Sequence, residues 1–219
     1  SLISSIANGF NIQMTNEEII EKACSIEINN LKKPIGKQDQ YLCAYSGFNS
    51  FTFFDNNLVK RNELSSQKLI TLRRLANDFY LIPSYKKRNS DTILSAISKC
   101  EDSVEKIMEI RSIASQFLSF DDNRDYKIEQ LFHESMKDSW DVKKTLSNVM
   151  TESLTDQYEI INKYIPNNWI RLIGAGSGGY FLVSAKIQKE NIDKLVDRNG
   201  IKGIFKVSIS DDGISSFKV

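Results

Sequence analysis

One acid early in the chain stands where it could take part in chemistry. Asp39 follows Gly36 and lies between the amide side chains of Gln38 and Gln40, ahead of an aromatic and small-residue run that reaches Asn49. A carboxylate in this setting can orient a substrate hydroxyl or take its proton. An acid after a glycine is also a common turn residue or helix cap. The spacing alone leaves both interpretations open.

A glycine-rich stretch near the other end of the chain is the second candidate. It reads Gly-Ala-Gly-Ser-Gly-Gly over residues 174–179, between two apolar segments. It is not a Walker loop, because no G-K-[ST] follows, and it is a poor dinucleotide fingerprint, because a strand rather than a long helix comes next. Glycines permit positive φ and close backbone approach, which turns peptide N–H groups towards an anion. The alternative is a tight β-hairpin, in which the glycines serve only the turn.

Composition and charge narrow the choice of partners. The chain has 219 residues and a net charge of +1, from 29 basic and 28 acidic residues, so no global field favours nucleic acid or an anionic membrane. Its hydrophobic fraction of 41% and charged fraction of 26% are typical of a soluble globular protein. No run approaches the ~20 apolar residues that span a bilayer. We therefore expect neither nucleic acid nor a membrane as a partner.

The cysteines and the histidine argue against two common kinds of site. Cys24, Cys43 and Cys100 are odd in number and show no C-x-x-C spacing. We expect them to be reduced, buried residues of a cytoplasmic protein rather than a disulfide frame or a zinc site. His133 is the single histidine, which argues against a His-based metal centre or a Ser-His triad, and we expect it to be structural.

The N-terminal third is predicted to contain two helices and a short β segment. Residues 2–12 show the apolar spacing of a buried helix. Thr15 and Glu18 form a capping-box pattern that opens a second helix, which should end before Lys33-Pro34. Glu27 lies near the C-terminal end of that helix, where the helix dipole disfavours an acid. Residues 50–54 have β-type composition, and a turn follows at 55–57.

The remainder of the chain is predicted to be α+β. A second β pair is expected at 67–73 and 77–83, after a polar join at 60–66 that is our candidate domain boundary. Helical periodicity then covers 91–100, 102–120, 125–150 and 152–164. The chain closes with strands at 169–173, 180–185, 203–209 and 214–218, a turn at 211–213 and a helix at 189–198. This order predicts an antiparallel sheet backed by helices.

These pieces together resemble the GHMP family of small-molecule kinases. Ile173–Tyr180 is similar to the family's third motif, a C-terminal G-A-G-x-G-G loop, and Ile35–Asn49 is similar to the segment that carries its catalytic aspartate. Within the family, Gly36–Tyr41 is closest to the heptose-phosphate kinase subgroup. The resemblance implies the remnant of an S5-like N-terminal kinase domain over residues 1–62. A ferredoxin-like α/β sandwich, the family's C-terminal domain, should follow over 63–219.

The resemblance also implies roles for individual residues. Asp39 matches the acid that takes or orients the proton of the acceptor hydroxyl, and Glu27 falls where sugar-kinase members place the glutamate that holds Mg²⁺. Tyr85 and Arg88 lie in a segment that resembles the one where galactokinases carry sugar-contacting residues. The substrate-binding set implied by the family is Gln38, Tyr85, Arg88, Gly174, Ala175, Gly176, Ser177 and Gly178.

Several family features do not occur in this chain. The second motif, a phosphate-binding loop of the P-x-G-L-G-S-S type, is absent, and residues 1–10 resemble the helix that should follow it. The first motif, the adenine-binding strands and the basic residue that usually partners the aspartate are also absent. The resemblance therefore covers essentially all of this chain but only the later part of a complete kinase, and we expect the chain alone to be inactive.

The resemblance implies an ATP- and Mg²⁺-dependent kinase whose acceptor is a sugar or sugar phosphate, with heptose 7-phosphate as the expected acceptor. One alternative is an enzyme of the galactokinase, fucokinase or mevalonate kinase type. Another is a non-catalytic relative that binds a sugar as a sensor or scaffold, and a third is an α+β interaction domain with coincidental motifs. The presence of Asp39, Glu27 and the glycine loop together favours the enzyme, and the oligomeric state stays open.

Overall fold

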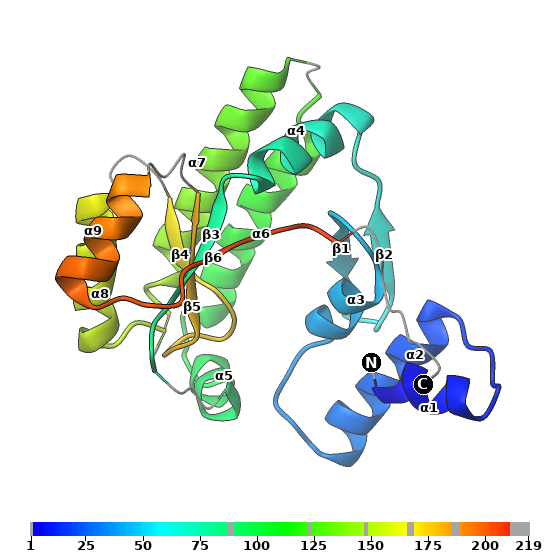
Figure 1. Ribbon diagram of the computed structural model, residues 1–219. Coiled ribbons are helices and arrows are strands. Elements are labelled where there is room, and N and C mark those ends of the chain that lie inside the picture. Colours follow the sequence, from blue (N-terminus) through cyan, green and yellow to red (C-terminus); the bar gives the residue numbers. More distant parts are fainter. Residues whose placement is uncertain are drawn as a thin grey trace. The chain divides into compact units, whose positions relative to one another are not determined.

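A computed structural model describes residues 2–86, 90–121, 124–146, 149–165, 169–184 and 189–210 (Figure 1). They form two compact units, which we describe separately: residues 2–65 with 209 and 210, and Ser66–Ser208. The assignment of the family's two domains to 1–62 and 63–219 stays a prediction. The turn expected at 211–213 and the strand expected at 214–218 lie outside the described residues.

The first unit begins with three helices and a π-helix: α1 (Leu2–Gly9), α2 (Asn16–Cys24), η1 (Ser25–Asn30) and α3 (Gln38–Ala44). The predicted capping box is confirmed. The Thr15 hydroxyl accepts a hydrogen bond from the Glu18 backbone N–H at 3.2 Å, and the Glu18 carboxylate accepts one from the Thr15 N–H at 2.8 Å. Helix α2 continues directly into η1, so the helical run ends before Lys33, as expected. Glu27 therefore lies within the π-helix.

A two-stranded antiparallel hairpin completes this unit. Strand β1 (Ser50–Phe53) was expected, whereas β2 (Val59–Asn62) occupies part of the stretch predicted to be a polar join. Lys60 and Arg61 are polar and gave no β-type signal in the sequence. They are extended here because they pair with β1. The ring of Phe51 packs 5.4 Å from that of Tyr41 on α3, centroid to centroid.

The second unit contains a four-stranded sheet of order β4-β5-β3-β6, in which all neighbours are antiparallel. Its strands are β3 (Phe79–Pro83), β4 (Ile170–Leu172), β5 (Tyr180–Ser184) and β6 (Phe205–Lys206). With helices between β3 and β4 and between β5 and β6, the connectivity is the β-α-β-β-α-β pattern of ferredoxin-like folds. The α+β class is confirmed, although β6 is shorter than the strand expected at 203–209.

In the described part of this unit, the sheet is accompanied by the helices α4 (Ser66–Ala76), α5 (Ser90–Ser98), α6 (Ser103–Ser119), α7 (Asp125–Lys143), α8 (Glu152–Tyr164) and α9 (Lys189–Asn199). The prediction of a strand at 67–73 was wrong, because α4 covers it. Its buried residues Lys68, Thr71, Leu72, Leu75 and Ala76 recur every three or four positions, which is a helical face. Helix α7 also ends at Lys143, before the expected limit near residue 150.

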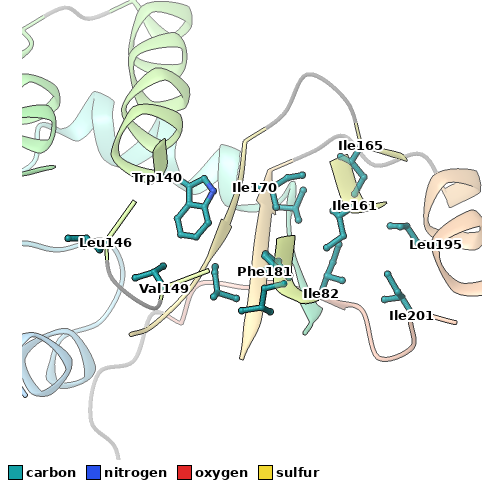
Figure 2. Close-up of a cluster of buried hydrophobic side chains, with 13 residues drawn as sticks. Ile82, Trp140, Leu146, Val149, Ile161, Ile165, Ile170, Phe181, Leu195 and Ile201 are labelled. Atoms are coloured by element: carbon teal, nitrogen blue, oxygen red, sulfur yellow. The ribbon is translucent and has the colours of Figure 1, made fainter. Parts of the chain in front are cut away.

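Alternation along β4 explains how the sheet is covered. The side chains of Trp169, just before the strand, and Arg171 face α7, where they contact His133, Met136 and Ser139. Ile170 and Leu172 point the other way, into a buried apolar cluster (Figure 2). Its other members are Ile82, Trp140, Leu146, Val149, Leu154, Ile161, Ile165, Phe181, Val183, Leu195 and Ile201.

The cysteines and the helices can be compared with what the sequence predicted about buried thiols and membrane spans. All three cysteines are free, but only Cys24 is buried, since Cys43 is exposed and Cys100 is intermediate; the prediction of three buried cysteines was wrong. Cys43 lies in α3, and Cys100 lies between α5 and α6, where its thiol donates a hydrogen bond to the Asp102 carboxylate at 3.1 Å. Among the residues of the model described above, no helix is both long and apolar enough to cross a membrane.

Candidate active site

Asp39 lies in the first turn of α3, at the start of a helix that Gln38 opens. Both side chains are exposed, and the Asp39 carboxylate makes no hydrogen bond or ion pair with the described part of the chain. The geometry therefore leaves an exposed carboxylate available to a ligand hydroxyl.

A side-chain contact joins Glu27 to the helix that carries Asp39. The Gln40 amide, one residue after Asp39, donates a hydrogen bond to the Glu27 carboxylate, so η1 and α3 are joined beside the candidate base. The Gln40 carbonyl oxygen is buried without a partner in the described chain. Two segments that are separate in the sequence thus meet at one place.

A magnesium site would have to draw on ligands beyond these side chains. Within the described ranges, no three His, Cys, Asp or Glu residues come together as a metal site. Mg²⁺ is usually held by one or two carboxylates with substrate phosphates and water completing the shell. Glu27 could be the one protein carboxylate of such a site. Its role in binding Mg²⁺ stays a prediction.

A cavity of about 350 Å³ lies between α2–η1 and α3. Lys37 and Tyr41 line its α3 side, and the Lys37 ammonium donates a hydrogen bond to the Asn57 side-chain carbonyl at 3.2 Å. Burial is the largest cause that raises the pKa of Tyr41, so its hydroxyl stays protonated at neutral pH. The cavity is therefore lined by one cationic side chain, that of Lys37, which lies two residues before Asp39 in the sequence.

The glycine loop joins β4 to β5 and is closed by a hydrogen bond from the Ile173 N–H to the Tyr180 carbonyl at 3.0 Å. Every loop residue except Ala175 has a positive φ: 86° at Gly174, 120° at Gly176, 54° at Ser177, 153° at Gly178 and 103° at Gly179. A two-residue hairpin turn needs at most two such residues. Residues 174–179 therefore form a six-residue loop and not the tight β-hairpin turn that was the alternative.

Two glycines of the loop are required by close contact with the chain itself. A Cβ on Gly176 would lie 2.8 Å from the Val149 Cα, and one on Gly178 would lie 2.4 Å from the Lys86 carbonyl oxygen. Neither distance is compatible with a side chain. These contacts account for the two glycines through packing, and the substrate-binding role of Gly176 and Gly178 stays a prediction.

Backbone and side-chain groups from three other segments hold the loop in place. The Ser177 N–H donates to the Val149 carbonyl at 2.9 Å, and the Gly179 N–H donates to the Lys86 carbonyl at 3.3 Å. The Lys143 ammonium donates to the Gly174 carbonyl at 2.7 Å. The Ser84 hydroxyl donates to the Gly179 carbonyl at 2.9 Å. No local pattern in the sequence distinguishes these supporting residues, so the sequence alone does not predict them.

The same hydrogen-bond arrangement leaves several loop donors unused. The backbone N–H groups of Gly174, Ala175, Gly176 and Gly178 have no acceptor in the part of the chain that the model describes. Successive amides in alternating right- and left-handed or turn conformations form concavities that bind anions. The loop therefore has the donors that a phosphate or carboxylate group would need.

Of the two sugar-contacting candidates beyond the loop, only Tyr85 can be located. Its hydroxyl exchanges hydrogen bonds with the backbone of Lys202, and its φ is 53°, although 60% of the residue is exposed. The hydroxyl is thus already bound within the protein, and the exposed ring is the part that a ligand can reach. Arg88 lies outside the described residues.

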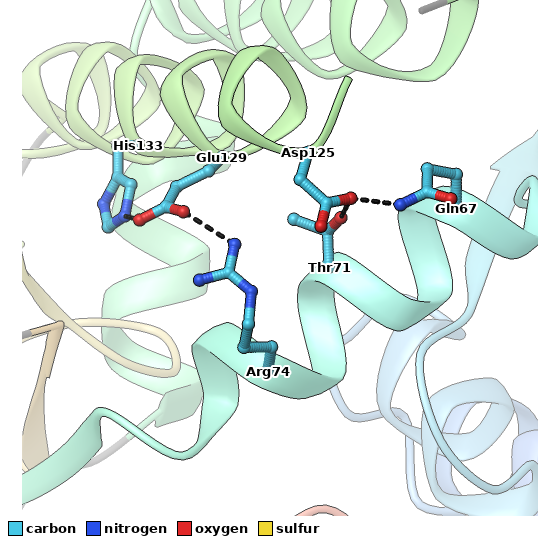
Figure 3. A network of polar contacts seen from close by, with 6 residues as sticks. All are labelled: Gln67, Thr71, Arg74, Asp125, Glu129 and His133. Carbon is cyan, nitrogen blue, oxygen red and sulfur yellow. Dashed lines mark hydrogen bonds and ion pairs between the residues drawn. The ribbon is translucent and has the colours of Figure 1, made fainter. Parts of the chain in front are cut away.

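His133 has the structural setting expected for it. Its Nδ1 accepts a hydrogen bond from the Trp169 indole N–H at 2.9 Å, and the adjacent Glu129 carboxylate pairs with Arg74 at 2.7 Å (Figure 3). Burial lowers the pKa of His133, so the imidazole is neutral at physiological pH. It joins α7 to the start of β4.

Known proteins share both sequence and fold with this chain. No family model matches it. It is 25% identical over 224 residues to the D-glycero-alpha-D-manno-heptose 7-phosphate kinase of Campylobacter jejuni, and the match covers 100% of this chain and 64% of that protein. The chain therefore spans less than two thirds of this curated relative.

Two solved structures show the same fold. The mevalonate kinase of Methanococcus jannaschii superimposes with a TM-score of 0.64 at 19% identity, over 91% of this chain and 58% of that one. A D-glycero-D-manno-heptose 1-phosphate kinase from Bacteroides thetaiotaomicron gives a TM-score of 0.62 at 19% identity, over 98% and 59%. Together with the curated match, these structures support the resemblance to the GHMP kinases that the sequence motifs indicated.

Proposed function

We propose that this chain belongs to an ATP-dependent kinase that transfers the γ-phosphoryl group to a hydroxyl of a sugar or sugar phosphate. The observation that carries the proposal is the glycine loop, whose free amides at Gly174, Ala175, Gly176 and Gly178 are held open by Lys143, Val149 and Lys86. A loop that served only as a turn would have no need of such external support. The similarity of the chain to kinases in sequence and in fold supports the assignment of a phosphate group to these amides.

The proposed mechanism relies on positioning, because phosphoryl transfer passes through a loose transition state that requires little covalent chemistry from the protein. Asp39 orients the acceptor hydroxyl and takes its proton. The loop amides donate hydrogen bonds to an anionic group of the substrates. Glu27, oriented by Gln40, would hold the Mg²⁺ ion that neutralises phosphate charge when bound with ATP. Gln38, Ser177, Tyr85 and Arg88 complete the proposed substrate-binding set.

For the acceptor we propose a heptose 7-phosphate. The curated relative acts on such a compound by its name. A sugar that already carries a phosphate needs cationic groups at its site. Lys37 lines the cavity beside α3 and supplies one such cation. Lys86 contacts the glycine loop through its backbone carbonyl, and its side chain is a second candidate for this role. Galactokinase-type acceptors lack that phosphate, so they provide the comparison substrate.

The test measures ADP release with heptose 7-phosphate and with galactose, in the complete protein of which this chain is the matched part. Asp39→Asn keeps the size of the side chain but removes the base. We expect turnover to fall about 10²- to 10⁴-fold, the usual contribution of a general base, with sugar-phosphate binding retained. Asp55→Asn, an exposed acid in the β1–β2 turn, is the matched control.

Retained turnover in Asp39→Asn would remove this residue from its proposed role. Sugar binding without turnover in the unaltered complete protein would support the sensor alternative instead. For the isolated 219-residue chain we expect negligible ATP-dependent activity, because it spans only 64% of the relative's length. A normal kinase rate from this chain alone would refute that expectation.

A further inference from the structure

A cavity of about 270 Å³ lies between the C-terminal end of α7 and helix α8. It is lined by Trp140, Lys144, Met150, Thr155, Tyr158 and Glu159. Ligand pockets usually measure about 300–1,000 Å³, so this one suits a small molecule. None of its lining residues belongs to the set proposed for phosphoryl transfer.

The floor of this cavity contains a buried donor that lacks an acceptor. Trp140 is 1% exposed, and its indole N–H has no hydrogen-bond partner in the described chain. Leaving such a group unpaired costs about 1–3 kcal/mol. Trp140 packs with Leu146 and Val149, which fix its ring against the apolar cluster (Figure 2). The N–H therefore cannot turn to another partner without disturbing the core.

The phenol of Tyr158 lies next to this donor. Burial is the largest cause that raises the pKa of Tyr158, and the Trp140 indole is a smaller influence in the opposite direction. The two groups line the same cavity, and no hydrogen bond of normal geometry joins them in the described chain. A small shift of the phenol would let its oxygen accept from Trp140 and direct its own O–H into the cavity. A ligand oxygen that accepts this O–H would satisfy both donors.

The charges around the cavity disfavour an anionic ligand. Lys144 is the only cationic lining residue, and its ammonium already pairs with Asp141 at 2.5 Å. Glu159 adds a second carboxylate at the exposed rim. The available groups are therefore a mixture of donors and acceptors without excess positive charge, beside the apolar surfaces of Met150 and the two aromatic rings. Such a mixture suits hydroxyl groups, which both donate and accept.

We propose that this cavity binds a neutral polyhydroxylated compound of monosaccharide size, with Tyr158 as its central hydrogen-bonding group. The site is also connected to the glycine loop. Lys143 and Val149 hold that loop, and their sequence neighbours Lys144 and Met150 line the cavity. The cavity and the loop are therefore built from adjacent residues of the same two segments.

The test uses D-mannose as a neutral probe and D-mannose 6-phosphate as its charged counterpart, with the 219-residue chain and without ATP. A ligand that binds only the folded state raises the melting temperature. We expect D-mannose to raise it in the unaltered chain and in Tyr126→Phe, an exposed tyrosine on α7 that serves as control. Tyr158→Phe should weaken binding about threefold to tenfold, the usual effect of losing one hydrogen bond.

A second variant keeps the proposal testable if Tyr158→Phe fails to fold. Glu159→Gln lies at the exposed rim and should also weaken mannose binding. The proposal is overturned if D-mannose has no effect, which would mean that water alone meets the indole N–H, or if the phosphorylated sugar binds more tightly. It is also overturned if Tyr85→Phe weakens binding while Tyr158→Phe does not, because the sugar then occupies the proposed acceptor site.

Discussion

His133 and Trp169 show how one hydrogen bond sets a protonation state. The Trp169 indole donates to His133 Nδ1, so that nitrogen must be unprotonated, and burial lowers the pKa of the imidazole in the same direction. Glu129 lies 3.9 Å from Nε2 and favours the charged form, but it already pairs with Arg74. The folded protein therefore holds a neutral histidine between α7 and the start of β4.

This arrangement predicts a pH dependence of stability. Because the folded state lowers the pKa of His133 below its unfolded value of about 6.5, the unfolded state binds the proton more readily. The contribution to stability is present above that value and is lost as the pH falls through the folded pKa. We expect a lower urea midpoint at pH 5 than at pH 7.5, and a smaller difference in His133→Gln. Equal pH dependence in both proteins would contradict this assignment.

Gly176 provides a second prediction at the scale of one residue. Gly176→Ala places a Cβ 2.8 Å from the Val149 Cα at a φ of 120°, so steric overlap and backbone strain add together. We expect a loss of about 1–3 kcal/mol in the free energy of unfolding, measured by urea denaturation. Gly200→Ala is the control, because its φ is 65° but no atom lies within 4 Å. An equal loss in both variants would mean that strain alone explains the glycine.

At the scale of elements, α2 is stabilised at its start by interactions that are local in sequence. Thr15→Ala removes the hydroxyl that accepts from the Glu18 N–H, and we expect a loss of about 1 kcal/mol in unfolding free energy. Thr15→Ser keeps the hydroxyl and should be close to the unaltered chain. Both values can be measured by urea unfolding followed by circular dichroism. A full loss in Thr15→Ser would assign the effect to the lost methyl group.

Helix α4 shows where local pattern and packing disagree. Its run of Leu, Ile and Thr residues has β-type composition, yet Thr71, Leu72 and Leu75 are buried on one helical face. Thr71 bonds Asp125 on α7, and Gln67 also contacts that carboxylate (Figure 3). The ammonium of Lys68 donates to the Leu118 carbonyl at 2.7 Å, near the end of α6. Contacts with two other helices therefore override a weak local preference.

At the scale of the whole molecule, large apolar side chains remain exposed in the first unit. They are Leu2, Ile6, Phe10, Ile12, Ile26, Leu31, Leu42, Phe53, Phe54 and Leu58. Among the described residues, its buried cluster consists of Ile20, Cys24 and Ala44, with Ile28, Tyr41 and Tyr45 partly buried against it. A two-stranded hairpin adds little independent stability. This unit thus buries little of its own apolar surface.

We therefore expect the 219-residue chain to bind the dye 8-anilinonaphthalene-1-sulfonate under native conditions, because exposed apolar surface of this extent attracts it. Phe10, which is 76% exposed, contributes to that surface, so Phe10→Ser should reduce the fluorescence. Val104→Ser, at a 69% exposed position in the second unit, is the matched control. Absence of dye binding in the unaltered chain would refute the expectation.

The features that the sequence determined by itself depend on neighbouring residues or on a periodic pattern. The capping box at Thr15, most of the helices and the glycine loop between two strands follow from neighbouring residues, and the resemblance identified Asp39 and Glu27 as candidates. Tertiary structure alone decided the pairing that makes β2 a strand, the contact between Glu27 and Gln40, and the support of the glycine loop by Lys143. These features join residues far apart in the chain, and no local pattern encodes which distant groups will meet.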